Sequence, residues 1–241
     1  MLERQGKSRR VRKSNQDPSF EYLITLSEND SPAAEAFRTL RTNLLYAVVG
    51  APPSPVMITS PNPREGKSVI CANLGVVLAQ AGKRTLIVDC DLRAPNQQEI
   101  FGLRSQPGMV NVLAGDCGLH EALQEGPVPD LSVLTVGPVP PNPTEVLGTR
   151  IFTELLDRLS REFEYVLVDA PPTQPVSDAL ILASQVDGVL LVIDSGGTRK
   201  EAVRRSMRSL ETVGANLLGT VMNNMMTSDA SYYGGGTYGH A

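Results

Sequence analysis

The chain has 241 residues, of which 41% are hydrophobic and 20% are charged, and it contains no Trp. This length suits one well-buried α/β domain and is short for two. No apolar run approaches the roughly 20 residues that a membrane-spanning helix needs. With only His120 and His240, the sequence argues against a histidine metal site and a Ser-His-Asp triad. The three cysteines follow no metal-ligand spacing, which suits inert thiols in a reducing cytoplasm.

The net charge of −4 conceals a strongly basic start of the chain. Residues 1–16 contain six Lys or Arg and one Glu, so the remainder of the chain is acidic. We predict that residues 1–30 form a disordered, solvated leader. The alternative is that this leader is attracted to an anionic membrane surface or to an acidic partner. The acidic remainder argues against general nucleic-acid binding.

Ahead of the first core strand, the sequence predicts one helix. A short strand is expected over Tyr22–Leu26. Ser31-Pro32 then supplies an N-cap and a first-turn proline, and the helix continues to Leu45. The proline-rich segment 50–55 ends this helix and leads into the core.

From residue 56 onward, apolar strands alternate with helices. The predicted strands are Val56–Ser60, Thr85–Asp89, Leu131–Val136, Tyr165–Asp169, Gly188–Asp194 and Asn216–Met222. The predicted helices are Lys67–Ala81, an irregular helical region over 96–126, Thr144–Arg161, Ser177–Ser184 and Thr198–Val213. Strands without polar alternation, separated by helices, predict an α/β fold. Its central sheet should be mostly parallel and covered by helices on both faces.

The segment Ser60–Ser68 connects the first core strand to a helix and ends in Gly66-Lys67-Ser68. This order is typical of a phosphate-binding loop, whose backbone N–H groups surround the phosphates. The lysine reaches the β- and γ-phosphates, and the serine hydroxyl ligates Mg²⁺. Pro61 stands where the usual pattern has glycine, so this loop alone leaves the assignment open.

Carboxylates follow two further strands of the predicted sheet. Asp89 and Asp91 come at the end of one apolar strand, and Asp169 ends another. In parallel sheets, ligands bind beyond the carboxyl ends of the strands. Such carboxylates can hold Mg²⁺ through its waters or accept a proton from a nucleophile. The three strand ends together therefore predict a Mg-ATP site.

These motifs resemble those of the bacterial tyrosine kinases of capsule and exopolysaccharide synthesis, over roughly residues 31–241. The matching motifs are Ser60-x-x-Pro63-x-Glu65-Gly66-Lys67-Ser68, Leu86-Ile87-Val88-Asp89-x-Asp91-x-Arg93 and Val166-Leu167-Val168-Asp169-x-x-Pro172. The resemblance implies a P-loop NTPase of the deviant-Walker type. The kinase domain would span residues 31–226, and residues 227–241 would form a flexible tail rich in Gly and Tyr.

The resemblance also implies a role for each residue of the site. Lys67 would neutralise the phosphates of ATP, and Ser68 would ligate Mg²⁺. Asp91 and Asp169 would hold the metal through water, and Asp89 would accept the proton of the attacking tyrosine hydroxyl. The catalytic group is therefore Lys67, Asp89, Asp91 and Asp169. The expected ATP-binding residues are Ser60, Pro63, Arg64, Glu65, Gly66, Lys67, Ser68, Val69 and Asn223.

By the same resemblance, the substrate is a tyrosine cluster on the tail of a neighbouring subunit. The phosphoacceptors would be Tyr232, Tyr233 and Tyr238, which lie among glycines. Glu35, Arg38 and Arg41 resemble the motif that packs subunits of this family into a ring. A separate transmembrane polysaccharide co-polymerase would be the activating partner. The protein would then work in the cytoplasm, at the inner face of the membrane.

Two residues of the loop separate the rival functions. A partition or division-site ATPase of the MinD and ParA type would carry a signature lysine where Asn62 stands. Arg64 occupies a position that is normally glycine in the kinases, and it would be strained if the backbone there needs a positive φ. A third alternative is a regulatory partner that binds ATP and transfers nothing.

Overall fold

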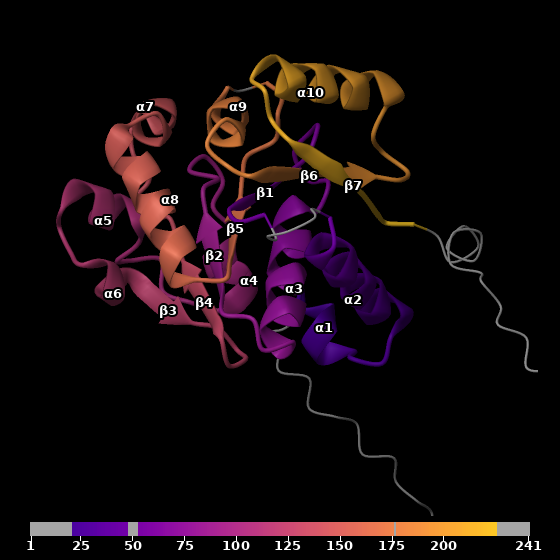
Figure 1. The fold of residues 1–241 in the computed structure, drawn as a ribbon, viewed down its shortest axis with the longest axis horizontal. Coiled ribbons are helices and arrows are strands. Elements are labelled where there is room, and N and C mark those ends of the chain that lie inside the picture. The colour runs from indigo at the N-terminus through magenta and orange to yellow at the C-terminus, as the bar shows by residue number, and fades with distance from the viewer. Residues whose placement is uncertain (1–20, 48–52, 176, 226–241) are drawn as a thin grey trace, which may run out of the picture.

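The structure, a computed structural model, describes residues 21–47, 53–175 and 177–225. Its centre is a sheet of seven strands in the order β3-β4-β2-β5-β1-β6-β7 (Figure 1). The strands are β1 (Val56–Thr59), β2 (Thr85–Asp89), β3 (Leu123–Glu125), β4 (Leu131–Leu134), β5 (Tyr165–Asp169), β6 (Gly188–Asp194) and β7 (Leu217–Asn223). All neighbouring pairs in the described sheet are parallel except β3 with β4. The predicted fold class is confirmed.

Helices cover both faces of this sheet (Figure 1). One group comprises α1 (Ile24–Ser27), α2 (Pro32–Leu45), α3 (Lys67–Gln80) and α4 (Gln97–Phe101). The other comprises α5 (Met109–Ala114), α6 (Leu119–Ala122), α7 (Pro143–Leu147), α8 (Arg150–Glu162), α9 (Asp178–Ala183) and α10 (Lys200–Thr212). No helix of the described residues is both long enough and apolar enough to cross a membrane.

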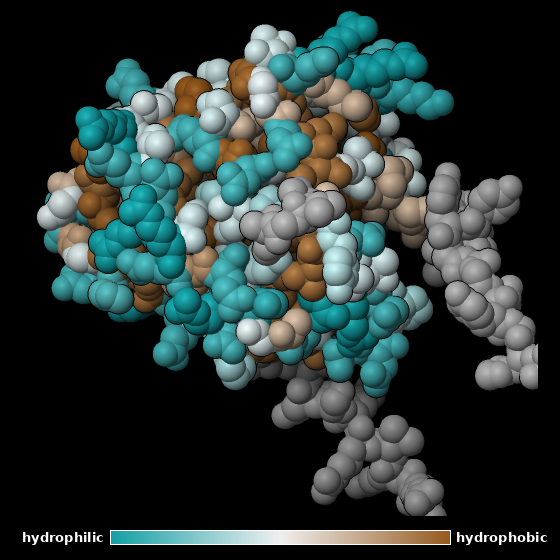
Figure 2. Space-filling view, viewed as in Figure 1, coloured by the Kyte–Doolittle hydropathy of each residue, from teal (hydrophilic) through white to brown (hydrophobic). Residues whose placement is uncertain are grey.

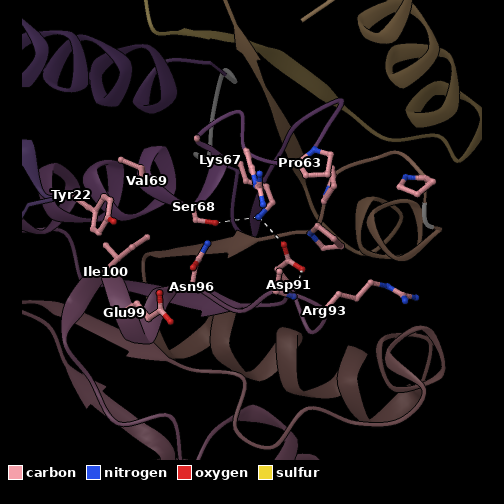
Figure 3. Close-up of a pocket in the computed structure, with 16 residues that line it drawn as sticks. Tyr22, Pro63, Lys67, Ser68, Val69, Asp91, Arg93, Asn96, Glu99 and Ile100 are labelled. Carbon is pink, nitrogen blue, oxygen red and sulfur yellow. Dashed lines mark hydrogen bonds and ion pairs between the residues drawn. The ribbon is translucent and has the colours of Figure 1, made fainter. Parts of the chain in front are cut away.

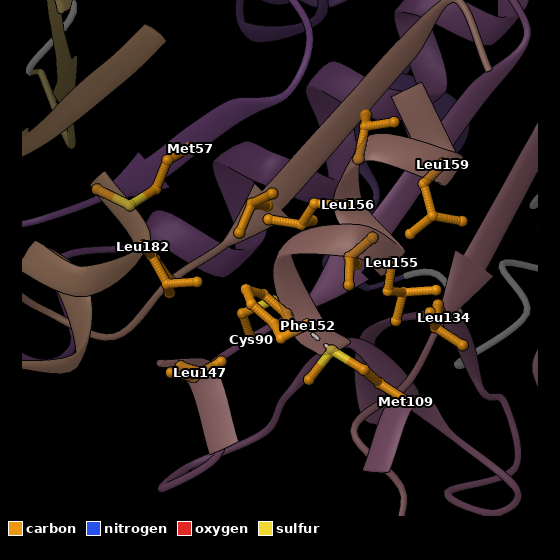
Figure 4. Close-up of a cluster of buried hydrophobic side chains, with 14 of the residues drawn as sticks. Met57, Cys90, Met109, Leu134, Leu147, Phe152, Leu155, Leu156, Leu159 and Leu182 are labelled. Carbon is orange, nitrogen blue, oxygen red and sulfur yellow. Dashed lines mark hydrogen bonds between the residues drawn. The ribbon is translucent and has the colours of Figure 1, made fainter. Parts of the chain in front are cut away.

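Each face of the sheet has its own hydrophobic cluster. Along β1, the side chains of Val56 and Ile58 join the cluster around α3, whereas Met57 between them joins the opposite cluster. This alternation follows from the two-residue period of a strand. On the second face, Phe152 of α8 is fully buried among leucines of neighbouring helices and strands (Figure 4). Strands buried on both faces explain why their sequences are continuously apolar.

The start of the described chain differs from the prediction. The strand expected over Tyr22–Leu26 is wrong, because Ile24–Ser27 form helix α1. Leu23 and Thr25 are buried, at 0% and 1% exposure. The buried amide of Asn73 accepts hydrogen bonds from the Thr25 N–H (3.1 Å) and hydroxyl (2.9 Å) and donates to the Tyr22 carbonyl (2.8 Å). Residues 21–30 therefore belong to the folded domain and not to the leader.

Two further elements differ from the sequence-based expectations. The single helix expected over Thr144–Arg161 is divided into α7 and α8 at Gly148-Thr149, where the Thr149 hydroxyl accepts from the Phe152 N–H at 3.2 Å and caps α8. The irregular helical region expected over 96–126 consists of the short helices α4, α5 and α6, and it also contains β3, which was not predicted. The remaining predicted helices and strands are confirmed within one or two residues at each end.

Candidate active site

The phosphate-binding loop between β1 and α3 has an unusual backbone at two positions. Gly66, the N-cap of α3, has φ 90°, and a Cβ there would collide with the side-chain amide of Asn223. Arg64 also lies in the left-handed region, with φ 64°. The strain anticipated at this position is therefore present, because a side chain makes that conformation costly.

Glu65 fixes the shape of this loop from within. Its buried carboxylate accepts hydrogen bonds from the Asn62 backbone N–H (3.0 Å) and side-chain amide (2.8 Å). The Thr198 hydroxyl, from the loop that follows β6, donates to the same carboxylate at 2.6 Å. The Asn223 amide at the end of β7 donates to the Glu65 carbonyl at 3.0 Å. Thr198 was not anticipated as part of the site, and only the fold brings it there.

Lys67 lies at the centre of the site among carboxylates. Its Nζ is 2.8 Å from Asp91 Oδ2 and 3.7 Å from Asp169 Oδ1, and it donates to the Ser68 hydroxyl at 3.1 Å. Burial lowers the pKa of Lys67, but the charges of Asp169 and Asp91 outweigh this effect and leave its pKa raised. Burial raises the pKa of Asp169, although Lys67 opposes this shift. The structure thus brings together four of the predicted residues.

Asp89, which the resemblance predicts to accept the substrate proton, does not line the cavity. It is fully buried, and its two oxygens accept from the backbone N–H groups of Asp91 (3.1 Å), Asn96 (3.0 Å) and Gln97 (3.0 Å). Burial, together with the nearby charge of Asp169, raises the pKa of Asp89 to about 8. Asp89 therefore holds the turn after β2, and Asp91 is the carboxylate of this motif that reaches the cavity.

Gln97, at the start of α4, was not predicted as a site residue. Its fully buried side-chain amide donates to Asp169 Oδ2 at 2.7 Å and to the Ser68 carbonyl at 3.1 Å. It therefore orients a carboxylate and the first turn of α3 at once. A glutamine in an irregular helical region carries no signal of such a role in the sequence.

Arg93 connects the turn after β2 to α7 and α9. Its Nε donates to Asp178 Oδ2 at 2.6 Å, and its terminal nitrogen donates to the Thr144 hydroxyl at 3.3 Å. The Thr144 hydroxyl donates in turn to Asp178 Oδ1 at 2.6 Å. Burial acts to raise the pKa of Asp178, but the hydrogen bonds from Arg93 and Thr144 prevail and lower it. Arg93 therefore caps the Asp178 carboxylate.

The phosphate-binding loop, the first turn of α3 and the turn after β2 line a cavity of about 730 Å³. Figure 3 shows Lys67, Ser68 and Asp91 in its middle, with Tyr22 and Ile100 toward one end and Arg93 toward the other. The predicted residues Pro63, Arg64, Gly66 and Val69 also line it. Ser60 lies behind the loop, where its hydroxyl donates to the Asn62 carbonyl at 2.7 Å. The volume is within the range of small-molecule sites.

The donor set fits Mg²⁺ held together with a nucleotide. No cluster of three His, Cys, Asp or Glu in the described chain could hold a metal alone. Asp169 Oδ1, however, is buried beside Lys67 and Ser68 without a hydrogen-bond partner in the described residues. Mg²⁺ retains waters and is bound by few carboxylates plus substrate phosphates, so this arrangement suits it.

The remaining predicted residues lie away from the cavity. Glu35 and Arg38 form an ion pair of 2.8 Å on the outer surface of α2, and Arg41 donates to the Val77 carbonyl of α3 at 3.2 Å. The tail tyrosines Tyr232, Tyr233 and Tyr238 lie outside the described residues, as do residues 1–16 of the leader.

A parallel sheet with a phosphate loop, Lys67-Ser68 and Asp169 at its carboxyl edge defines a P-loop nucleotide-binding protein. Residues 56–232 match the family model of the CobQ/CobB/MinD/ParA nucleotide binding domain. The structure resembles that of the septum site-determining protein MinD of Pyrococcus horikoshii complexed with Mg-ADP. That likeness has a TM-score of 0.61 at 22% identity, over 74% of this chain and 76% of that one, and shows the fold alone.

Proteins that are more similar in sequence show which family of P-loop proteins this is. The tyrosine-protein kinase YwqD of Bacillus subtilis is 41% identical over 212 residues, which cover 88% of this chain and 90% of that protein. The tyrosine-protein kinase ptk of Acinetobacter johnsonii is 35% identical over 211 residues, 87% of this chain but 29% of that protein. The crystal structure of the chimerical protein CapA2B2 has a TM-score of 0.82 and 39% identity, over 86% and 91% of the two chains. The chain therefore belongs to the bacterial tyrosine-protein kinases.

Proposed function

We propose that this protein transfers the γ-phosphoryl group of ATP to Tyr232, Tyr233 and Tyr238 on the tail of a neighbouring copy, and thereby regulates capsule or exopolysaccharide synthesis. The observation that carries the proposal is the placement of Lys67, Ser68 and Asp91 in the middle of one cavity. The membership of the kinase family supports the choice of tyrosine as acceptor. Three of the chain's six tyrosines lie in its last ten residues.

The transfer begins with an exchange of partners at Lys67. Without nucleotide, Lys67 is neutralised by Asp91 at 2.8 Å. The phosphates of ATP carry more negative charge, so they draw Lys67 away and leave the Asp91 carboxylate free at the cavity wall. A tyrosine hydroxyl has a pKa near 10, so it needs a base as it attacks.

Asp91 is the base in this proposal, in place of Asp89. The tyrosine oxygen forms a bond to the γ-phosphorus, the bond from that phosphorus to the bridging oxygen of ADP breaks, and the phenolic proton goes to Asp91. Ser68 and Asp169 would hold Mg²⁺, which supplies charge neutralisation when it is bound with the nucleotide. Gln97 keeps Asp169 oriented through its 2.7 Å hydrogen bond.

Assembly and location are part of the same proposal. The kinase forms a ring through α2, where Glu35 and Arg38 are 67% and 29% exposed. Its activator is a transmembrane polysaccharide co-polymerase, and the kinase works at the inner face of the membrane. Two features support this: the basic residues 1–16, and the much greater length of the relative in Acinetobacter johnsonii, of which this chain matches 29%.

The test is a mixing experiment with the full chain and Mg-ATP. One variant, Lys67→Ala, has an intact tail and no phosphate-binding lysine. The other carries Tyr→Phe changes at positions 232, 233 and 238 and an intact site. Neither should label itself, and the mixture should place phosphotyrosine on the Lys67→Ala chain, as located by mass spectrometry. Lys83→Ala, which removes an exposed lysine paired with Glu164, is the matched control and should label normally.

Three results would contradict the proposal. Tail label on Lys67→Ala incubated by itself would show that this lysine is dispensable. An unlabelled mixture, when the unaltered protein labels its own tail, would refute transfer between copies. ATP binding without any label, even with the co-polymerase present, would favour the regulatory partner. That alternative is supported by the strained Arg64 in the phosphate loop.

A further inference from the structure

Helix α10 presents a basic face to solvent on an otherwise acidic protein. Arg199, Lys200, Arg204, Arg205 and Arg208 are all exposed, whereas the buried residues of this helix are Ala202, Ser206 and Leu210. The helix and its N-cap carry five basic residues against two acidic ones, while the whole chain has a net charge of −4. Figure 2 shows hydrophilic side chains projecting along the edge of the molecule where α10 lies in Figure 1.

These basic side chains have no acidic partners within the described part of the chain. None of them takes part in an ion pair there. On α8, by contrast, Arg150 and Arg158 each pair at 2.7 Å with a glutamate four residues later. Lys200, Arg204 and Arg208 repeat every four residues and so form a row about 12 Å long. The row is a line of positive charge along the exposed side of α10.

The chain leaves the described structure next to the N-terminus of α10. The Asn224 amide, just beyond β7, donates to Asp194 Oδ1 at 3.1 Å. The Asp194 carbonyl accepts from the Thr198 N–H at 3.0 Å, directly before α10. Sixteen residues follow the last described residue, Met225, and Tyr232 is the seventh of them. Seven extended residues span about 25 Å, so the tail tyrosines can reach the basic row.

The tail acquires the matching charge only when it is phosphorylated. Residues 226–241 contain one Asp and no Glu, Lys or Arg. Each phosphotyrosine adds about −1.5 to −2 charges and three acceptor oxygens. Arginine, which supplies four of the five basic residues, binds phosphate through two parallel hydrogen bonds. Met207, 43% exposed on the same helix, offers an apolar contact to a tyrosine ring.

We propose that the basic face of α10 binds the phosphorylated tail of its own chain. The site rests on the proposed function in one respect, because that reaction supplies the phosphotyrosines. Its consequence is that a tail that has already reacted is withdrawn from the neighbouring active site, which leaves that site free for an unreacted tail.

The test measures fluorescence anisotropy of a labelled synthetic peptide of residues 226–241, phosphorylated at 232, 233 and 238. The protein is the full chain with its three tail tyrosines changed to Phe, so that its own tail stays unphosphorylated. The unphosphorylated peptide should bind at least about tenfold more weakly. Arg204→Glu with Arg208→Glu should weaken phosphopeptide binding by at least about tenfold, and the double Lys variant by less, because it keeps the charge.

Arg158→Glu on α8 is the matched control, because it changes the same charge elsewhere and should alter the affinity less than about twofold. Circular dichroism confirms that each variant is folded. Equal binding of both peptides, or indifference to the Arg204 and Arg208 changes, would overturn the proposal. So would arginine-dependent binding of anionic phospholipid vesicles without binding of the phosphopeptide. Since the peptide is synthetic, absence of kinase activity would refute the proposed function and leave this binding result intact.

Discussion

Replacing Arg64 by glycine should make the protein more stable while weakening its interaction with ATP. At φ 64°, the left-handed conformation costs a non-glycine residue about 1–2 kcal/mol. Glycine also makes the unfolded chain more flexible, which offsets about 0.5–1 kcal/mol of the gain from the relieved strain. The free energy of unfolding should therefore rise by about 0.5–1 kcal/mol, which corresponds to an increase of about 1–4 °C in Tm for a chain of this size.

The charge of the Arg64 side chain should affect ATP binding independently of the strain in its backbone. The side chain is exposed and lines the cavity, and an exposed ion pair is worth up to about 1 kcal/mol. Losing it should raise the KM for ATP by about threefold. Arg64→Lys keeps both the strain and the charge, so it should resemble the natural protein in both measurements.

Asp130 provides the matched control for strain, because it also has φ 64° but lies in the loop before β4, away from the cavity. Asp130→Gly should give a similar gain in urea unfolding and no change in KM. If Asp130→Gly stabilises the protein and Arg64→Gly destabilises it, the strain argument fails at Arg64. The loop backbone would then be held by contacts of the arginine side chain.

Three other predictions concern different parts of the molecule. Thr198→Val should lower the free energy of unfolding by about 1–3 kcal/mol and weaken ATP binding, because it removes a donor from the buried Glu65 carboxylate; unchanged ATP titrations would show that this contact does not shape the loop. Since the pKa of Asp89 is raised to about 8, its protonation favours the folded state most fully below about pH 4 and this contribution is lost as the pH rises through 8. Urea unfolding without nucleotide should therefore show stability that falls with pH from 5 to 8, by at most about 1.4 kcal/mol per pH unit, and a flat profile would contradict the raised pKa. Thr149→Ala should cost about 1 kcal/mol by uncapping α8 at Phe152 and leave tail phosphorylation unchanged, whereas a loss of phosphorylation would mean that the cap also supports the site.

The parts of the fold that could be predicted are those in which local pattern and burial agree. Continuous apolar runs such as Thr85–Asp89 indicate strands buried on both faces, and Gly66-Lys67-Ser68 marks the start of α3. The break between α7 and α8 did have a signal, because Gly148-Thr149 combines a poor helix former with a good N-cap. Helix-forming residues on both sides of this break make the segment resemble one helix in the sequence.

The sequence predicts those site residues that directly follow a strand. It does not predict those that reach the site only through the packing of distant segments. Asp91 and Asp89 follow the same strand, and the sequence places both at the correct edge of the sheet. Which one faces the cavity depends on the turn through Asn96 and Gln97, whose backbone N–H groups surround Asp89. Gln97 itself lies 72 residues from Asp169 in the sequence, so only the folded chain reveals their contact.

The buried amide of Asn73 connects the first described residues to α3, the helix that begins with Lys67-Ser68. Besides Thr25 and Tyr22, it bonds to the Val69 carbonyl at 2.9 Å, in the turn of α3 that follows Lys67-Ser68. A protein trimmed to begin at residue 31 would lose the Leu23 side chain from the core, worth about 1.5–3 kcal/mol. It would also leave Asn73 Oδ1 without its two donors from Thr25, at about 1–3 kcal/mol, while the amide nitrogen would keep only its bond to Val69. A displacement of Tyr22 or Thr25 would therefore act through Asn73 on the helix that carries the phosphate-binding lysine.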